Sequence, residues 1–421
     1  MVWRVWNAMR HNWQRRGCEA NELKLTIMNR YRTFFTGMAA VIIATVIWLP
    51  SVHFLFRPSV EGGSRRSGVS QQARALAARH LELWTEPVLK EQELSRMRLS
   101  NAEWDFMGRS FLVWSLAEMG MREPERKASY LPVMDQIIDE TIRLEREKGI
   151  YIFLMGYARE RAYVQQPARS LFVDGEIALM LGLRRVVQEK VEYREPMRER
   201  IDAMIARMRA SKALVAESYP DECWLFDHAV ALAAMRVADF CDGTDHSAFT
   251  REWLVAARTN LVHAQTGLLN SSFTTEGQVL DGPEGSSIWM AAHCLRTVDD
   301  AFARDQYRRA RKELGREVGG FAWSREWPVS ARNSMDIDSG MVVPILDASA
   351  GGSGLAFVGA SSFGDIDYGI RLRTALDFAG FPLRRKGSLK YCASNQVGDA
   401  VLLYAEVLGP IWDTIKKGAK Q

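Results

Sequence analysis

A loop that runs into an apolar helix carries the densest group of reactive side chains in the sequence. Carboxylates near aromatic walls can have raised pKa values, which general-acid catalysis near neutral pH requires. We therefore interpret Asp221 and Asp227 as catalytic candidates. The substrate-binding candidates of the same loop are Tyr219, Glu222, Cys223 and Trp224. The structural alternative is that Asp227 caps the helix beginning near His228 and Asp221 closes a turn after Pro220.

A second carboxylate group lies at the start of a strongly apolar helix, in the segment 171–182. Glu176 stands among apolar residues, where an unpaired carboxylate is costly to bury. A partner or a cavity would explain its presence, so Glu176 is a third catalytic candidate. Asp174 is a substrate-binding candidate, or simply the cap of this helix.

A third group alternates acidic and apolar residues between Met335 and Gly340. If the stretch is extended, Asp336 and Asp338 can face the same side, as a metal site or an acid/base pair would require. We take Asp338 as a catalytic candidate and Asp336 as a binding candidate. The alternative is that Asp338 caps a helix.

A glycine-rich segment before the helix that carries Trp289 adds Glu284 to the binding candidates. Glycines there permit close backbone approach to a ligand. Trp289 and Trp323 belong to a group of aromatic residues around the long loops, which fits sugar stacking, an apolar substrate or core packing. With seven histidines and none in ligand spacing, we expect no zinc or other metal, and no cofactor. The chain carries no Walker A loop and no dinucleotide-binding fingerprint.

The elements that must position these residues are mainly helices. Apolar residues recur at three- and four-residue steps from residue 72 onward, which predicts thirteen helical segments: 72–95, 102–120, 128–148, 169–190, 194–213, 226–241, 246–263, 285–298, 300–317, 338–347, 352–363, 365–379 and 396–417. The clearest strand signal is a short hairpin over 268–280, turning at Glu276-Gly277. A dozen helices without a sequence repeat, joined by several long loops, favour an all-α fold of the (α/α)6-toroid type.

The N-terminal region predicts a membrane anchor. Seven basic and two acidic residues precede Phe34, so this head has a net charge of +5. The whole chain has a net charge of +4, so the remainder is close to neutral. The segment 34–56 contains no charged residue and is long enough to cross a bilayer. A buried core helix or a signal peptide is the alternative. The expected organisation is a basic head at 1–33, a transmembrane helix at 34–56, a linker at 57–72 and one toroid domain at 73–421.

Charge and membrane topology limit the kinds of partner that we expect. Because the basic excess is confined to the head, nucleic acid is not expected to bind. We expect a single-pass membrane protein whose main domain lies outside the cytoplasm and which associates with the lipid bilayer and, as one option, with further copies of itself. Five scattered cysteines without a C-x-x-C pair do not decide the compartment.

From Tyr219 onward the chain resembles the linalool dehydratase/isomerase family. The resemblance rests on short segments: the Pro220-Asp221 loop, Gly243-Thr244-Asp245 before a Trp253-bearing helix, Thr266-Gly267-Leu268, Asp300-Ala301-Phe302 and the Asp336-x-Asp338-Ser339-Gly340 approach to a glycine-rich helix. It implies an (α/α)6 barrel and cofactor-independent dehydration or isomerisation of an alcohol or terpenoid. The chain departs from the family where Asp174-Gly175-Glu176 replaces the expected histidine.

Three functions follow as hypotheses. The first is a lyase or isomerase that uses Glu176, Asp221, Asp227 and Asp338 for acid/base chemistry on an alcohol. The second is an (α/α)6 glycoside hydrolase or lyase acting on envelope carbohydrate, in which Asp221 or Glu222 pairs with Glu176. The third is a non-catalytic binding domain. A closed apolar cavity would favour the first, an open groove with exposed tryptophans the second, and carboxyl groups scattered over the surface the third.

Overall fold

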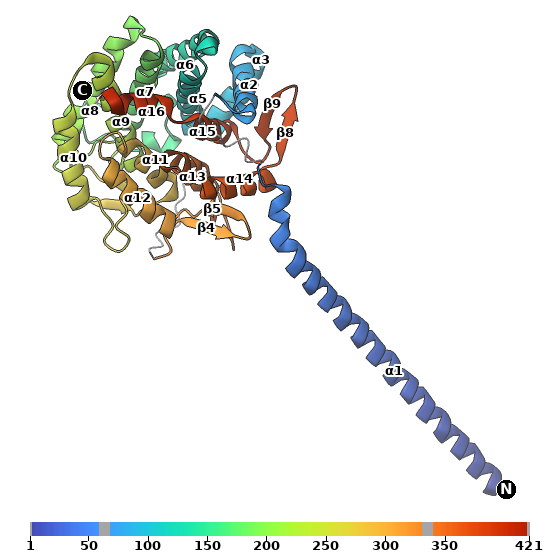
Figure 1. The fold of residues 1–421 in the computed structure, drawn as a ribbon. Helices are drawn as coiled ribbons and strands as arrows, with labels where there is room; N and C mark the ends of the chain where they lie inside the picture. The colour runs from blue at the N-terminus through green and yellow to red at the C-terminus, as the bar shows by residue number, and fades with distance from the viewer. Residues whose placement is uncertain (1, 59–67, 331–339, 419–421) are drawn as a thin grey trace. The chain divides into compact units, whose positions relative to one another are not determined.

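The computed structural model describes residues 2–58, 68–330 and 340–418, in two compact units, Met1–Leu55 and Phe56–Gln421 (Figure 1). The first unit is the helix α1, Val2–Trp48, followed by a 3-10 helix, Leu49–Leu55. The α-helix ends before Pro50, because proline lacks an amide hydrogen and its ring clashes with the preceding turn. The expected basic head and most of the apolar segment belong to this one helix.

The stretch Thr26–Leu55 is long and apolar enough to cross a membrane, and the segment has no buried residue in its most apolar window. It begins earlier than the predicted 34–56, and residues 26–33 belong to the same helix. A signal sequence near an N-terminus meets the same criteria of length and composition.

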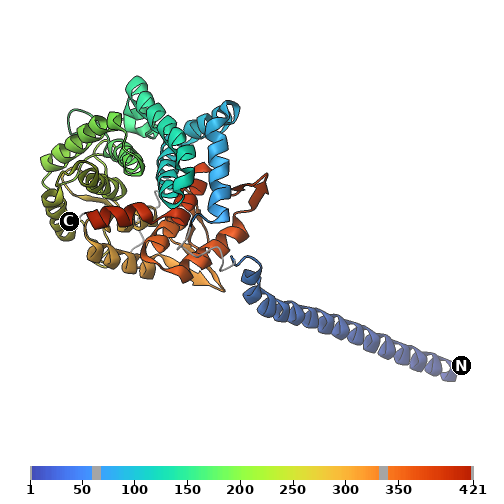
Figure 2. The ribbon, with the colours of Figure 1, turned by 45° about the horizontal axis from the view of Figure 1, so that its top comes forward.

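Six helices of the second unit form a closed inner ring, because each packs on the next and the last returns to the first. They are α5 (Ala102–Arg122), α7 (Leu171–Val187), α9 (Leu225–Asp242), α11 (Gly285–Leu295), α13 (Ala350–Phe363) and α15 (Gln396–Val407). Nearly every residue of α7 is buried, as expected for a helix that is apolar on all sides. This ring is the centre of the predicted (α/α)6 toroid (Figure 2).

The remaining helices lie outside the ring. They are α2 (Gln71–Thr85), α3 (Pro87–Lys90), α4 (Arg96–Ser100), α6 (Lys127–Lys148), α8 (Arg194–Ala210), α10 (Ser247–Asn260), α12 (Asp300–Glu313), α14 (Ile366–Ala379) and α16 (Pro410–Gly418), with a π-helical turn at Glu91–Ser95. In α12 the buried residues include Phe302, Gln306 and Ala310, at four-residue steps. Such an amphipathic helix buries one stripe on the inner ring and leaves the other to solvent.

Short strands fill the loops between helix pairs. The first sheet pairs β1 (Cys223–Trp224) with β2 (Ser272–Phe273), and β2 with β3 (Val279–Asp281). The second pairs β4 (Gly315–Val318), β5 (Phe321–Ser324), β7 (Ala348–Ser349) and β6 (Val342–Val343) in that order. The third is a hairpin of β8 (Pro382–Arg385) and β9 (Ser388–Tyr391).

The fold class is as predicted, and the predicted hairpin over 268–280 is present as β2 and β3. Three details of the prediction are wrong. The segment 72–95 is broken after Thr85, ahead of Pro87, and 396–417 is broken at Gly409 before Pro410. The helix expected at 338–347 is replaced, from Gly340 on, by turns and β6. The hairpins β4–β5 and β8–β9 were not predicted, because each has one strand, β4 (GREV) or β8 (PLRR), whose side chains do not alternate between apolar and polar.

Candidate active site

A cavity of about 940 Å³ lies at the amino-terminal ends of the inner helices. Its walls include Glu103 of α5, Phe172 of α7, Asp227 of α9, Ser287 of α11 and Leu355 of α13. The cavity reaches the surface, since Met341 on its rim is 79% exposed. Because helix amino termini carry partial positive charge, this end of the ring stabilises negatively charged groups.

Seven carboxyl groups line this cavity among the described residues, and we call them the cavity acids. They are Glu103, Asp221, Glu222, Asp227, Asp281, Glu284 and Glu326. Four of them, Asp221, Glu222, Asp227 and Glu284, are site residues predicted from the sequence. The aromatic walls are Trp104, Tyr157, Phe172, Tyr219, Trp224 and Phe226, of which Tyr219 and Trp224 were predicted.

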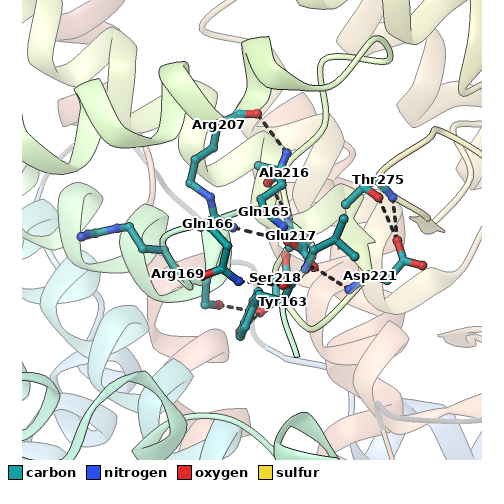
Figure 3. Close-up of polar contacts among 12 residues, drawn as sticks. Tyr163, Gln165, Gln166, Arg169, Arg207, Ala216, Glu217, Ser218, Asp221 and Thr275 are labelled. Carbon is teal, nitrogen blue, oxygen red and sulfur yellow. Dashed lines mark hydrogen bonds and ion pairs between the residues drawn. The ribbon is translucent and has the colours of Figure 1, made fainter. Parts of the chain in front are cut away.

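The loop before α9 is held by one buried carboxylate, Glu217 (Figure 3). Its oxygens accept hydrogen bonds from the backbone amides of Val164 (2.9 Å), Gln165 (2.6 Å) and Asp221 (2.7 Å). The Arg207 guanidinium lies 3.8 Å from it and supplies a positive charge. Three amide donors and one cation satisfy a charge that could not otherwise be buried. Glu217 therefore fixes the shape of the loop that carries the predicted residues.

Asp221 occupies the turn of this loop. The turn is Tyr219-Pro220-Asp221-Glu222, closed by the Glu222 amide donating to the Tyr219 carbonyl (2.9 Å). Asp221 has a φ of 56°, the left-handed conformation that the residue after proline needs in a type II turn and that aspartate tolerates. Its carboxylate accepts from the backbone amide (3.1 Å) and the hydroxyl (2.9 Å) of Thr275 (Figure 3). Its side chain is thereby directed by the neighbouring hairpin.

Asp227 lies in the first turn of α9, where β1 feeds into the helix. Pairing of Cys223 with Phe273, and the hydrogen bond from the Leu225 amide to the Ser271 carbonyl (2.8 Å), fix the entry of the chain. The Asp227 side chain is buried yet lines the cavity. Burial raises its pKa to about 8, against the opposing effect of the Ser218 hydroxyl, and the charge of Glu103 adds to the increase. Asp227 therefore retains its proton near neutral pH.

Glu176 lies in α7, the inner helix that packs on α9, and it is not part of the cavity lining. It is 1% exposed, and its two oxygens make no hydrogen bond of normal geometry. Burial raises its pKa well above the ordinary value; Ser110 opposes this increase, and the charge of Asp227 reinforces it. Glu176 is thus a buried carboxyl outside the cavity lining, and its predicted pairing with Asp221 or Glu222 stays a prediction.

Tyrosine side chains connect the cavity acids. The Tyr219 hydroxyl donates to Glu103 and accepts from the Met155 amide (2.9 Å). Tyr157 stacks on Tyr219 with ring centroids 4.9 Å apart, and its hydroxyl donates to Glu222 (3.2 Å). Glu222 also pairs with Arg161 at 3.0 Å. These contacts leave a flat aromatic face beside hydrogen-bonding carboxylates.

The opposite wall is built by close backbone approach. The Gly285 amide donates to the Glu326 carbonyl (2.7 Å), and a Cβ at Gly285 would come within 2.4 Å of the Arg325 carbonyl oxygen. Glycine is therefore required at position 285, the first residue of α11, directly after the predicted residue Glu284. The Glu326 carboxylate accepts from Ser286 (3.1 Å, backbone amide) and from the hydroxyl of Ser349.

Several predicted residues lie outside the cavity. Asp174 is buried in ion pairs with Arg169 (2.5 Å) and Arg200 (2.6 Å). Cys223 is fully buried in β1, and burial raises its pKa above the usual range. The Trp289 indole donates to Ser324 (2.9 Å) within the core, and that of Trp323 donates to the Leu346 carbonyl (3.0 Å).

Asp336 and Asp338 lie outside the described residues, so their expected roles remain predictions. His228 is a core histidine: one ring nitrogen accepts from the Ala216 amide (3.0 Å) and the other contacts the Trp224 carbonyl (2.6 Å). Burial lowers its pKa to about 4. Within the described ranges, no group of three or more histidine, cysteine or acidic side chains is arranged to hold a metal ion.

Three of the cavity acids, Glu103, Asp281 and Glu326, were not predicted from the sequence. Glu103 follows Asn101, whose side chain caps α5 by accepting from the Trp104 amide (2.9 Å). The segment Asn101-Ala102-Glu103 thus carries a helix-start signal, and in this fold helix starts surround the cavity. Glu326 follows β5 in a loop with no comparable signal.

Comparison with solved structures finds chains that share part of this structure. The chain is similar in structure to the GH76 α-mannanase of Bacteroides thetaiotaomicron, with 12% identity over 73% of this chain and 86% of that one and a TM-score of 0.46. It is also similar to the unsaturated glucuronyl hydrolase of Bacillus sp. GL1, with 13% identity, the same two coverages and a TM-score of 0.47. No protein-family model and no curated protein matches the sequence. The resemblance to the linalool dehydratase/isomerase family receives no support from these comparisons.

Proposed function

We propose that the protein is a carbohydrate-acting enzyme of the (α/α)6-toroid class, a glycoside hydrolase or lyase, in which Asp227 is the general acid. The observation that carries the proposal is a protonated, buried carboxyl group facing a cavity that also holds other carboxylates. Glycoside cleavage needs one carboxyl that delivers a proton and a second that accepts one. Asp227 has the raised pKa of the first.

In this proposal the Asp227 proton passes to the glycosidic oxygen as the bond between that oxygen and the sugar carbon breaks. The electron pair of the bond stays on the leaving oxygen, which becomes a hydroxyl. Asp221 and Glu222, which line the same cavity, are the candidates for the second carboxyl. One of them removes a proton from the attacking water in hydrolysis, or from the sugar ring in elimination.

The lining supports a polar substrate with flat apolar faces. Trp104, Tyr157 and Trp224 offer aromatic surfaces, and the cavity acids offer acceptors for hydroxyl groups. Dehydration or isomerisation of a terpenoid alcohol would use the same proton donor, but a terpenoid would be better held by a closed apolar cavity. The carboxyl-rich lining and the exposed rim therefore favour carbohydrate.

The proposal is tested by incubating the full chain with a panel of envelope polysaccharides and oligosaccharides and detecting products by mass spectrometry. We expect release of sugars, with a mass gain of water in hydrolysis and none in elimination. Asp227→Asn should lower the rate by about 10²–10⁴. Asp245→Asn, in an exposed loop, is the matched control and should leave the rate unchanged. Turnover of terpenoid alcohols with no action on any glycan would contradict the proposal.

A further inference from the structure

One exposed surface of the second unit combines apolar and basic side chains, and we call it the hairpin surface. Its apolar members are Phe378 at the end of α14 (50% exposed), Phe381 (67%) and Leu383 of β8 (48%). Arg384, Arg385 and Lys386 follow directly at the tip of the hairpin, and all three are exposed. Solvent-exposed phenylalanines beside a basic cluster are typical of a surface that binds a partner.

The two strands of this hairpin have different roles. Leu389 and Tyr391 of β9 are buried, β9 packs on α2, and the Tyr391 hydroxyl donates to Asp377 (2.6 Å). Every residue of β8 is exposed, and within the described residues β8 pairs only with β9. The body of the protein thus holds β9 and presents β8, together with its apolar and basic side chains, to the exterior.

The hairpin surface adjoins the point where the chain enters this unit. The Phe56 ring lies 5.1 Å from the ring of Phe378, which in turn lies 5.3 Å from that of Phe321. Phe56 directly follows Leu55, the last residue of the candidate membrane span. The hairpin surface therefore lies beside the residue through which the candidate span is joined to this unit.

The charges of the hairpin tip are available for a partner. No ion pair joins Arg384, Arg385 or Lys386 to any carboxylate among the described residues, whereas Arg304 and Arg309 of α12 pair with Asp300 and Asp305. Unpaired cations beside exposed phenylalanines match an anionic membrane surface, because the cations attract phosphate groups and the rings enter the apolar boundary.

We propose that the hairpin surface docks on the anionic phospholipid bilayer in which α1 is anchored, and so fixes the orientation of the toroid on the membrane. This inference rests on α1 spanning the bilayer and is independent of the proposed carbohydrate chemistry. The occupant is a lipid surface and not a second copy of the chain, because a row of exposed cations beside exposed aromatic rings is complementary to phosphate groups over an apolar boundary.

The test uses the full chain in lipid nanodiscs, either pure phosphatidylcholine or phosphatidylcholine with about one third phosphatidylglycerol. Hydrogen–deuterium exchange is measured for the peptide covering residues 377–391. We expect at least threefold slower exchange in the anionic discs. Arg384→Glu/Arg385→Glu/Lys386→Glu should abolish this difference, and Phe381→Ser/Leu383→Ser should reduce the protection in both kinds of disc.

The matched control is Arg143→Glu/Arg146→Glu/Lys148→Glu on α6, three exposed basic residues outside the hairpin surface. It should retain the full protection of the 377–391 peptide in anionic discs. Equal exchange in both kinds of disc, or equal loss of protection in the control variant, would overturn the proposal. Protection that depends on protein concentration and not on lipid charge would overturn it in favour of a contact between copies.

Discussion

Two opposing effects act on the Asp227 carboxyl, and burial is the larger. A carboxylate in the first turn of a helix is normally stabilised by the helix dipole, by about 0.3–1 kcal/mol at exposed sites. Asp227 is in that position in α9, yet its pKa is raised to about 8 because the side chain is removed from water. Desolvation of an unpaired ion costs several kcal/mol and outweighs the dipole. The carboxyl group is therefore an acid at physiological pH and not a structural cap.

This protonation state predicts the pH profile of the proposed activity. A general acid must carry its proton, so kcat/KM should fall as the pH rises through about 8, the pKa of Asp227. The measurement is kcat/KM between pH 5 and 10 on a glycan identified in the panel. Glu118→Gln is the control: the pKa of Glu118 is also raised, to about 7, but it accepts from Gly409 and Ile411 outside the cavity. A descending limb that moves in Glu118→Gln would contradict the assignment.

Glu176 predicts a pH-dependent contribution to stability. Its folded pKa lies well above its ordinary value of 4.5, so above pH 4.5 the folded state holds a proton that the unfolded state has lost. The free energy of unfolding therefore falls as the pH rises from about 4.5 towards the folded pKa. Glu176→Gln keeps the shape and removes the ionisation, so the variant should gain stability relative to the natural chain as the pH rises from 5 to 9.

Urea unfolding at several pH values measures this difference. Asp227 and Asp399, whose pKa values are also raised, contribute with the same sign and remain in the variant, so its slope should be reduced and not abolished. A variant whose stability runs parallel to that of the natural chain over the whole range would show that Glu176 is not buried as a neutral group.

At the scale of elements, the loop before α9 is ordered by Glu217 and not by its own sequence preferences. Glu217→Gln leaves a side chain that cannot accept from all three amides of Val164, Gln165 and Asp221. One unpaired buried amide costs about 1–3 kcal/mol. We expect a loss of stability of that size in chemical denaturation, together with a fall in kcat, because Asp221 and Asp227 are displaced. Glu195→Gln, on an exposed face of α8, should change neither.

The elements also show what the sequence could reveal of the site. The loop 217–227 was identifiable because it concentrates acids and aromatics before an apolar helix, and three cavity acids, Asp221, Glu222 and Asp227, were predicted in this way. Glu176 was predicted as a site residue because it is a carboxylate in an apolar helix. Hydrophobic periodicity cannot distinguish a residue on the inner face of the ring from a residue in the cavity wall. The helix-start signal at Asn101 marks the segment with Glu103, but only the closed ring brings α5 and the loop after β5, which carries Glu326, to the same cavity.

At the scale of the whole molecule, helical periodicity was sufficient to predict an (α/α)6 toroid behind an apolar N-terminal helix. The strands were harder to predict, because β4, β5, β8 and β9 are short and are stabilised by contacts with helices distant in sequence, such as β9 on α2 and β5 on α14. The candidate site is likewise formed by distant parts of the chain. Residues at the starts of all six inner helices line the cavity, so no single segment of sequence contains it.

The most direct test of the account is the dependence of the Asp227→Asn variant on the leaving group. For a sugar found active in the panel, a series of aryl glycosides with leaving groups of graded acidity is compared with the natural glycoside. A good leaving group needs no proton in the transition state, whereas a sugar hydroxyl does. The account predicts a loss of about 10²–10⁴ for the natural glycoside and little loss for the most acidic phenol. Equal losses across the series would contradict the assignment of Asp227 as the general acid.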